Sequence, residues 1–256
     1  MASRCSSEAS CLIATQCRQL ASSEPERHLI PNPKLSYREP MNEFTPVRVK
    51  VWGDFACFTR PEMKVERVTY DVMTPSAARG ILEAIFWKPE FEWRVQRIHV
   101  LKPIRRASIR RNEVKSKASE SAAKKWAQRG GGYFTDADRT QRHTLALRNV
   151  AYLIDADVHL RTHTGDAHPA KYRDQFRRRV ARGQCFHHPY LGCREFAAAF
   201  GEPDGSEQAI DRSEDLGRML FDLQYSGDDG RDRPLFFQAR LENGVLHIPQ
   251  NLYDQS

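Results

Sequence analysis

The chain has 256 residues, which is long enough to bury a core as one large domain or as two small ones. Hydrophobic residues make up 40% and charged residues 29% of it, a composition typical of globular proteins. No apolar run approaches the roughly 20 residues of a membrane-spanning helix, so we expect no membrane partner. The net charge of +7 and the pI near 9.2 indicate a polyanionic partner.

The charge is divided unevenly along the chain. Residues 201–256 contain twelve acidic and five basic residues, a net charge of −7, so residues 1–200 carry +14. This division predicts a nucleic-acid-binding portion followed by an acidic remainder. The alternative is a solvated charged surface, which would usually mix both signs.

Residues 1–42 are predicted to be a disordered leader. They show no sustained periodicity, are rich in Ser, Ala, Glu and Pro, and contain three of the six cysteines. Met41 offers one alternative start for the natural protein, and leader peptides in a mass spectrum of the native protein would contradict it. The cysteines do not form the pattern of a secreted disulfide framework, so we expect a reduced, cytoplasmic protein.

The first predicted elements are two strands and a helix. The alternating sequence VRVKVW from residue 47 predicts a half-buried strand that ends at Gly53. A second strand is expected over Val65–Met73. Thr74 and Pro75 then have the residue types of a helix N-cap and first position, which predicts a helix over Ser76–Trp87.

The rest of the chain predicts mainly strands. Trp93–Ile109 is interpreted as a strand and hairpin, and Leu145–Arg161 as a long strand; Pro169 opens a basic helix. The turn sequences GDDG and ENG separate several short segments after it. These predicted short strands are Phe186–Phe196, Leu216–Tyr225, Pro234–Leu241 and Val245–Ile248.

Strands outnumber helices, and an early strand is followed by one well-capped helix. This order predicts an α+β fold, with a ferredoxin-like or RRM-type N-terminal domain at residues 43–196. A smaller, acidic, antiparallel β-sheet domain is expected at residues 197–256.

A basic segment lies between Arg94 and Arg129, with twelve Lys or Arg residues against two Glu. Its middle, rich in Lys, Ser and Ala, is predicted to be loop-like and suited to following a phosphate backbone. A solvated charge run is the alternative. The aromatic residues Trp87, Trp93, Trp126 and Tyr133 accompany the charge, either as core or as stacking surfaces for unpaired bases.

Together with the basic helix, this segment supplies the candidate nucleic-acid contacts. They are Trp87, Lys88, Arg105, Arg106, Arg110, Arg111, Lys115, Lys117, Arg177, Arg178, Arg179 and Arg182.

The basic helix also contains candidate proton-transfer groups. Tyr172, Phe176 and Val180 recur at four-residue steps, which predicts a stripe that packs against the core. The alternative to this core packing is that the Tyr172 hydroxyl reaches a ligand. Lys171 lies on an adjoining face, where it could exchange protons or simply contact a phosphate.

A cysteine and histidine segment follows this helix. Cys185, His187, His188 and Cys193 form the pattern C-x-H-H-x4-C, whereas structural zinc sites use two well-separated ligand pairs. We therefore expect no metal site and no cofactor.

From Met41 onward the chain resembles the CRISPR-associated Cas-five family, d subtype, of type I-C systems. The matching blocks cover most of residues 47–196 in the order of the family. They are VWGDFACFT, YDVMTPSAARGILEAIFWKP, IHVLKPI, TLALRNVAYLI, KYRDQF and GQCFHHPYLGCREF.

The resemblance implies an RRM-like N-terminal domain with an additional β-sheet domain. It also implies a metal-independent endoribonuclease that cleaves precursor CRISPR RNA within each repeat, keeps the 5′ handle and joins the type I-C interference complex. In this chemistry a 2′-hydroxyl attacks the phosphate, which leaves a 2′,3′-cyclic phosphate and a 5′-hydroxyl. A base, an acid and a cation for the phosphorane charge are required.

The family's site is a Tyr in the block EAIFWKP and a Lys-His pair at the start of the basic helix. Here the Lys is Lys171, whereas Phe86 stands at the Tyr position and Tyr172 at the His position. Phe86 cannot transfer a proton. A phenol with a pKa near 10 is a poorer base at pH 7 than an imidazole near 6.5, and His168 is a further candidate.

Two alternatives follow from these departures. The protein could be a non-catalytic RNA-binding subunit of the same complex. It could also bind duplex DNA through its basic face, because phosphate contacts carry little sequence information.

Overall fold

A computed structural model describes residues 46–117, 119–162, 168–225 and 232–255 of the chain. The predicted leader and the GDDG turn lie outside these residues. No helix within the described ranges is long and apolar enough to cross a membrane.

The described strands form one nine-stranded, mostly antiparallel sheet, and three α-helices accompany it, which confirms the α+β class. Seven strands follow one another in hydrogen-bonding order, and the remaining two pair with β5. The seven are β6 (Ala199–Gly201), β1 (Val47–Ala56), β5 (Arg139–Leu160), β3 (Phe91–Val100), β9 (Val245–His247), β8 (Asp232–Glu242) and β7 (Glu214–Tyr225). The other two are β2 (Arg67–Val68) and β4 (Arg106–Val114).

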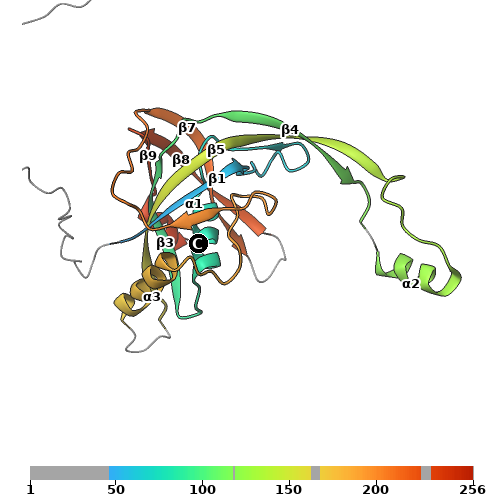
Figure 1. Ribbon diagram of the computed structural model, residues 1–256, viewed down its shortest axis with the longest axis horizontal. Helices are drawn as coiled ribbons and strands as arrows, with labels where there is room; N and C mark the ends of the chain where they lie inside the picture. Colours follow the sequence, from blue (N-terminus) through green and yellow to red (C-terminus); the bar gives the residue numbers. More distant parts are fainter. Residues whose placement is uncertain (1–45, 118, 163–167, 226–231, 256) are drawn as a thin grey trace, which may run out of the picture. The chain divides into compact units, whose positions relative to one another are not determined.

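Strand β5 organises the sheet. Its residue Leu147 pairs with Ala56 of β1 and with Arg106 of β4, so β1 and β4 lie along opposite edges of β5. Beyond Thr144, the last residue of β5 that pairs with β2, β4 and the first part of β5 extend as a two-stranded ribbon, which we call the arm, with α2 (Glu120–Arg129) at its far end (Figure 1). Asn149, with φ of 51°, interrupts the β1 pairing.

The two predicted helix starts are confirmed. The Thr74 hydroxyl accepts a hydrogen bond from the amide of Ala77 at 3.3 Å, and Pro75 opens α1 (Pro75–Ile85). Pro169 opens α3 (Pro169–Ala181) with His168 as N-cap. A short 3-10 helix, η1 (Gln250–Gln255), follows β9.

Several other predictions are wrong. Trp93–Ile109 is not a hairpin, because β3 and β4 each pair with β5. Of the loop expected in the Lys-, Ser- and Ala-rich middle of the basic segment, the described residues 115–117 and 119 lie outside any helix or strand, whereas the rest is the helix α2. The strand β4 precedes this middle and alternates along its length between exposed and half-buried residues. The strand expected at Val65–Met73 is reduced to the two residues of β2, and Phe186–Phe196 contains only an isolated bridge from Tyr190.

The C-terminal strands continue the sheet, since β9 pairs with β3. Asn243 and Gly244, with φ of 48° and 75°, form the two-residue turn between β8 and β9 that the ENG sequence predicts. The division into domains at residues 196 and 197 stays a prediction.

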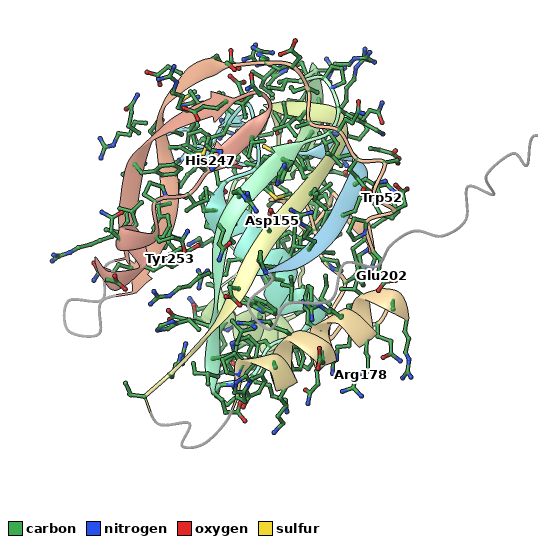
Figure 2. The ribbon with its side chains drawn as sticks, turned by 90° about the vertical axis from the view of Figure 1, so that its left-hand side faces the viewer. Trp52, Asp155, Arg178, Glu202, His247 and Tyr253 are labelled. Atoms are coloured by element: carbon green, nitrogen blue, oxygen red, sulfur yellow. The ribbon has the colours of Figure 1, made fainter. Side chains whose placement is uncertain are left out.

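The two faces of the sheet differ in chemistry. Val47, Val49 and Val51 of β1 are buried in the core, together with the apolar sides of α1 and α3. The alternate residues Arg48, Lys50 and Trp52 lie on the other face, which we call the outer face (Figure 2).

Candidate active site and nucleic-acid interface

The first turn of α3 brings three of the predicted site residues together. The ring nitrogen Nδ1 of His168 accepts a hydrogen bond from the Ala170 amide at 3.2 Å, and the Lys171 amide donates to the His168 carbonyl at 3.2 Å. Lys171 is exposed, and its Nζ lies 5.6 Å from the centroid of the Tyr172 ring. The positive end of the helix dipole adds to the cationic character of this turn, which favours a phosphate.

Tyr172 is part of the core. It is 4% exposed and forms a buried stripe with Phe176 and Val180, which confirms the predicted packing. Its ring centroid lies 5.0 Å from that of Phe91. Among the described residues its hydroxyl makes no hydrogen bond, so the oxygen is not committed to the fold.

Phe86 is also buried, and it packs against Phe91, the residue that contacts Tyr172. Its ring lies 5.6 Å from Phe91, and the guanidinium of Arg179 lies 5.1 Å from the Phe86 centroid. Phe91 thus contacts both Phe86 and Tyr172, so the fold brings together the positions that the resemblance singles out. The sequence alone could not show this, because Phe86 ends α1 and Tyr172 begins α3.

The carboxyl end of α1 is held by donors from distant segments. Arg179 donates to the Ile85 carbonyl at 2.9 Å, and the Trp93 indole donates to the Phe86 carbonyl at 2.9 Å. The amides of Phe186 and His187 both donate to the Ala84 carbonyl. The segment that contains His187 therefore fixes the end of α1 next to Phe86.

The predicted arginine contacts of α3 differ in availability. Arg179 is committed to the α1 carbonyl, and Arg177 pairs with Asp174 at 3.3 Å. Arg178 and Arg182 are exposed. These two side chains are the best placed of the set to contact a phosphate.

The other predicted contacts lie just after α1, on β4 and directly beside β4 in sequence. Trp87 and Lys88 are exposed, as are Arg105, Arg110, Lys115 and Lys117. Arg106 is exposed too and donates to Asp71. Arg111 is 17% exposed and pairs with Glu113 and Glu195, both at 2.9 Å, so it is the least available of them.

The accompanying aromatic residues divide between core and surface. Trp93 is 1% exposed and packs against Phe176 with ring centroids 4.8 Å apart, so it belongs to the core. Trp126 and Tyr133 stack on each other in the arm. Trp87, half exposed at the end of α1, remains available for a base.

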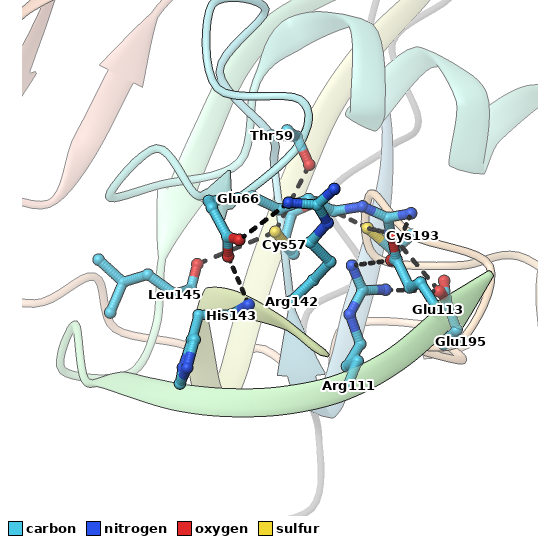
Figure 3. Close-up of polar contacts among 11 residues, drawn as sticks. Cys57, Thr59, Glu66, Arg111, Glu113, Arg142, His143, Leu145, Cys193 and Glu195 are labelled. Atoms are coloured by element: carbon cyan, nitrogen blue, oxygen red, sulfur yellow. Dashed lines mark hydrogen bonds and ion pairs between the residues drawn. The ribbon is translucent and has the colours of Figure 1, made fainter. Parts of the chain in front are cut away.

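Two cysteines meet at the base of the arm (Figure 3). The Arg67 guanidinium donates to the Cys193 sulfur at 3.3 Å and also approaches Glu195, the partner of Arg111. A hydrogen bond with Cys57 and the charge of Arg67 outweigh burial and lower the pKa of Cys193 to about 6, while the pKa of Cys57 is raised. Within the described ranges no three His, Cys, Asp or Glu residues gather as metal ligands.

Sequence reasoning missed a charged cluster on the outer face. Asp155 of β5 is fully buried between Arg48, Arg97 and His99, which lie within 3.2 Å of its oxygens. Burial acts to raise the pKa of Asp155, but the hydrogen bond with His99 and the arginine charges hold it below its usual value. The alternating pattern of β1 indicated an exposed face, whereas the cluster itself depends on strand register.

Known proteins match this chain over most of its length. The family model described as CRISPR-associated protein (Cas_Cas5) matches residues 47–249. A Thermus thermophilus protein named CRISPR pre-crRNA endoribonuclease Cas5d is 46% identical over 225 residues, covering 82% of this chain and 93% of the relative. A protein of the same name from Mannheimia succiniciproducens is 46% identical over 215 residues, covering 79% and 94%.

A solved structure titled Crystal Structure of CRISPR-associated Protein shares the fold. It has a TM-score of 0.57 and 22% sequence identity, and the match covers 80% of this chain and 92% of that one. The sequence matches and the shared fold agree with the resemblance seen in the sequence blocks. The chain belongs to the CRISPR-associated Cas5 family, in its Cas5d branch.

Proposed function

We propose that this protein is a metal-independent endoribonuclease that binds precursor CRISPR RNA and cleaves it within the repeat. The observation that carries the proposal is the gathering of His168, Lys171 and Tyr172 in the first turn of α3, beside Phe86. Two relatives that are 46% identical bear the name CRISPR pre-crRNA endoribonuclease.

The reaction moves two protons. A base removes the proton of the 2′-hydroxyl, whose oxygen then attacks the adjacent phosphorus and forms the cyclic phosphate. The bond to the 5′-oxygen breaks, and an acid gives that oxygen a proton. Lys171 stabilises the charge of the phosphorane or shuttles a proton, and Tyr172 acts as acid or base.

Two departures from the family pattern affect the proton transfers. Phe86 lacks a hydroxyl, and Tyr172 replaces an imidazole. His168, the N-cap of α3, is the histidine three positions before Lys171. Because its Nδ1 accepts the cap hydrogen bond, the neutral ring carries its proton on Nε2, so His168 takes part in a proton transfer only when the ring leaves the cap and changes its tautomer.

The exposed cations hold the repeat. Arg178 of α3 and Arg182 at its C-cap contact phosphates further along the RNA from the scissile bond, and the basic residues of β4 extend the contact along the arm. Trp87, 51% exposed at the end of α1, stacks on an unpaired base.

The wider setting follows the resemblance. We place an RRM-like domain at residues 43–196 and a smaller sheet domain at 197–256. The protein works in the cytoplasm, keeps the 5′ handle of its product, and joins the other subunits of a type I-C interference complex.

One assay tests the proposal: a labelled repeat hairpin is incubated with the protein in EDTA, and the RNA ends are resolved. We expect a 2′,3′-cyclic phosphate and a 5′-hydroxyl. Lys171→Ala should lower the cleavage rate by about a hundredfold or more, with only a modest loss of affinity. Equal losses of rate and affinity would reassign Lys171 to phosphate contact.

A second variant probes the Phe86 departure. Phe86→Tyr restores a hydroxyl next to Phe91 and should raise the cleavage rate without changing affinity. A rate unchanged in this variant, with the protein still folded, would place the proton transfer on other groups, His168 first.

The missing hydroxyl at Phe86 favours one second candidate, a non-catalytic RNA-binding subunit of the same complex. Binding of the hairpin without any cyclic-phosphate product would establish it. Duplex DNA binding through the exposed cations of β4 is compatible with either function, and a labelled duplex in the same assay measures it.

A further inference from the structure

We propose that the outer face of the sheet binds an unpaired segment of RNA, with Arg48 and Arg97 contacting phosphates and Trp52 stacking on a base. This inference rests on the proposed function for its substrate. It adds a contact region that is separate in sequence from α3 and the arm.

Two cations of this face, Arg48 and Arg97, belong to a row of paired residues across four strands. Arg48 of β1 pairs in register with Asp155 of β5, which pairs in turn with Arg97 of β3, and Arg97 pairs with His247 of β9. Directly opposed residues of neighbouring strands share one face of a sheet. Asp155 and His247 are labelled on this face in Figure 2.

One buried carboxylate orients two exposed arginines. The Nε of Arg48 lies 3.0 Å and an Nη of Arg97 lies 2.9 Å from different oxygens of Asp155. The Asp155 side chain is 0% exposed, whereas Arg48 and Arg97 are 50% and 38% exposed. Each guanidinium has five N–H donors, so both keep donors for a ligand after binding Asp155. The fixed excess of positive charge suits phosphate oxygens.

A hollow with an aromatic wall lies further along β1. Trp52, 39% exposed, is four residues after Arg48 on the same face. It lines a hollow of about 390 Å³ together with Lys50, Lys102, Ala151, Glu202 and Asp204. The exposed indole is a stacking surface for an unpaired base. Lys50 is paired with Glu207 at 2.9 Å and Asp204 at 3.5 Å, so Lys102 is the cation of this lining that is left for an adjoining phosphate.

The chemistry of the face identifies its occupant. At the rise of a strand, Trp52 lies about 13 Å from Arg48, so a ligand that reaches both is an extended chain. An acidic peptide would meet Glu202 and Asp204 at the hollow. A nucleobase instead has exocyclic amino groups, which can donate hydrogen bonds to these two carboxylates. In a duplex the bases are stacked on each other, which excludes the contact with Trp52.

The test compares two labelled RNAs, a repeat hairpin with a short unpaired extension and the same hairpin without it. The wild-type protein should bind the extended hairpin more tightly. Trp52→Leu should weaken binding of the extended hairpin by about tenfold, since base stacking on an aromatic side chain is worth about this much, and leave the other unchanged. Arg48→Gln should do likewise and reduce the salt dependence of the extended hairpin by about 0.7 in log–log slope, while Arg97 still compensates Asp155.

Arg212→Gln is the matched control, because Arg212 is 43% exposed and paired with Glu214 at 2.7 Å, outside the row. It should leave both affinities unchanged. If Arg48→Gln does not fold, as judged by circular dichroism, Trp52→Leu decides the question.

An extension that adds equal affinity in wild type and Trp52→Leu would overturn the inference. If the two variants lowered the affinity for both hairpins equally, the inference would also be overturned, because the face would then contribute only non-specific attraction to RNA. Displacement of the extension by polyglutamate, with no effect of Trp52→Leu, would assign the face to an acidic protein. Wild-type protein that binds neither hairpin would instead contradict the proposed function itself.

Discussion

The helix α3 and the arm are both rich in Lys and Arg, but they hold these residues in opposite ways. In α3 the cations lie on a helix whose other side is buried in the core. Arg173 forms an ion pair with Asp157, and Arg179 donates a hydrogen bond to the Ile85 carbonyl. In the arm, α2 buries no residue and β4 is exposed along one side. A cation that must meet one phosphate in a defined geometry needs the first kind of support, whereas backbone tracking needs only the second.

The largest expected effect concerns the buried stripe. Phe176→Ala removes a fully buried ring that packs against Trp93, so it should lower the free energy of unfolding by about 3–5 kcal/mol. Trp126→Ala in the arm is the matched aromatic control and should change it by less than about 0.5 kcal/mol. Chemical denaturation of both variants measures the difference, and similar losses would show that the arm is supported like α3.

The next effect concerns the anchoring of α3 to β5. Asp157→Asn removes the carboxylate charge that lies 2.8 Å from the Arg173 guanidinium, which is 8% exposed. We expect a loss of about 3 kcal/mol, because removing one charge of a largely buried ion pair is costly. Asp136→Asn, which frees the exposed Arg139 in the arm, should cost less than about 1 kcal/mol. Equal losses in the free energy of unfolding for the two variants would show that α3 and the arm hold their cations with similar support.

A smaller effect should appear at the base of the arm as a dependence on pH. The pKa of Cys193 is lowered to about 6 in the folded protein, below its value in the unfolded chain. Its thiolate therefore stabilises the fold above the unfolded pKa, near 8.5, and this contribution is lost as the pH falls through about 6.

Urea denaturation of wild type and Cys193→Ser across this range tests the point. The free energy of unfolding of wild type should exceed that of Cys193→Ser by an amount that grows as the pH rises. A flat difference for Cys193→Ser would mean that the thiol stays protonated.

The smallest change in stability should accompany a change in binding. The double variant Lys115→Gln and Lys117→Gln alters two exposed side chains of the arm. Unfolding should be unaffected, while the logarithmic salt dependence of RNA binding should fall by about 0.7–0.9 for each lysine that contacts a phosphate. An unchanged salt dependence would exclude both lysines from the interface.

Local signals explain which parts of the fold could be predicted. Thr74 with Pro75, and Pro169, specify helix starts through contacts within one turn, and the spacing of Tyr172, Phe176 and Val180 identifies a buried stripe. The prediction of a strand and hairpin over Trp93–Ile109 reached only the start of β4, because the sequence RASIRRNEV contains few apolar residues and is ordered by pairing with β5.

The site divides in the same way. The first turn of α3 could be predicted because its residues are neighbours in sequence. The meeting of Phe86 and Tyr172 at Phe91 depends on the packing of α1, β3 and α3. The row that contains Asp155 depends on the register of four strands. No pattern within one segment contains that information.

The central position of β5 has a consequence for the synthesis of the chain. Strands β1, β3 and β4 all precede β5, and each needs it as a partner. At translation rates of about 5–20 residues per second, β1 leaves the ribosome roughly 5–20 s before β5 is complete. During that interval its valine-rich edge has no partner within the nascent chain, which is a hazard for aggregation. Variants that destabilise β5 should therefore reduce the yield of folded protein in cells more than their equilibrium stability indicates.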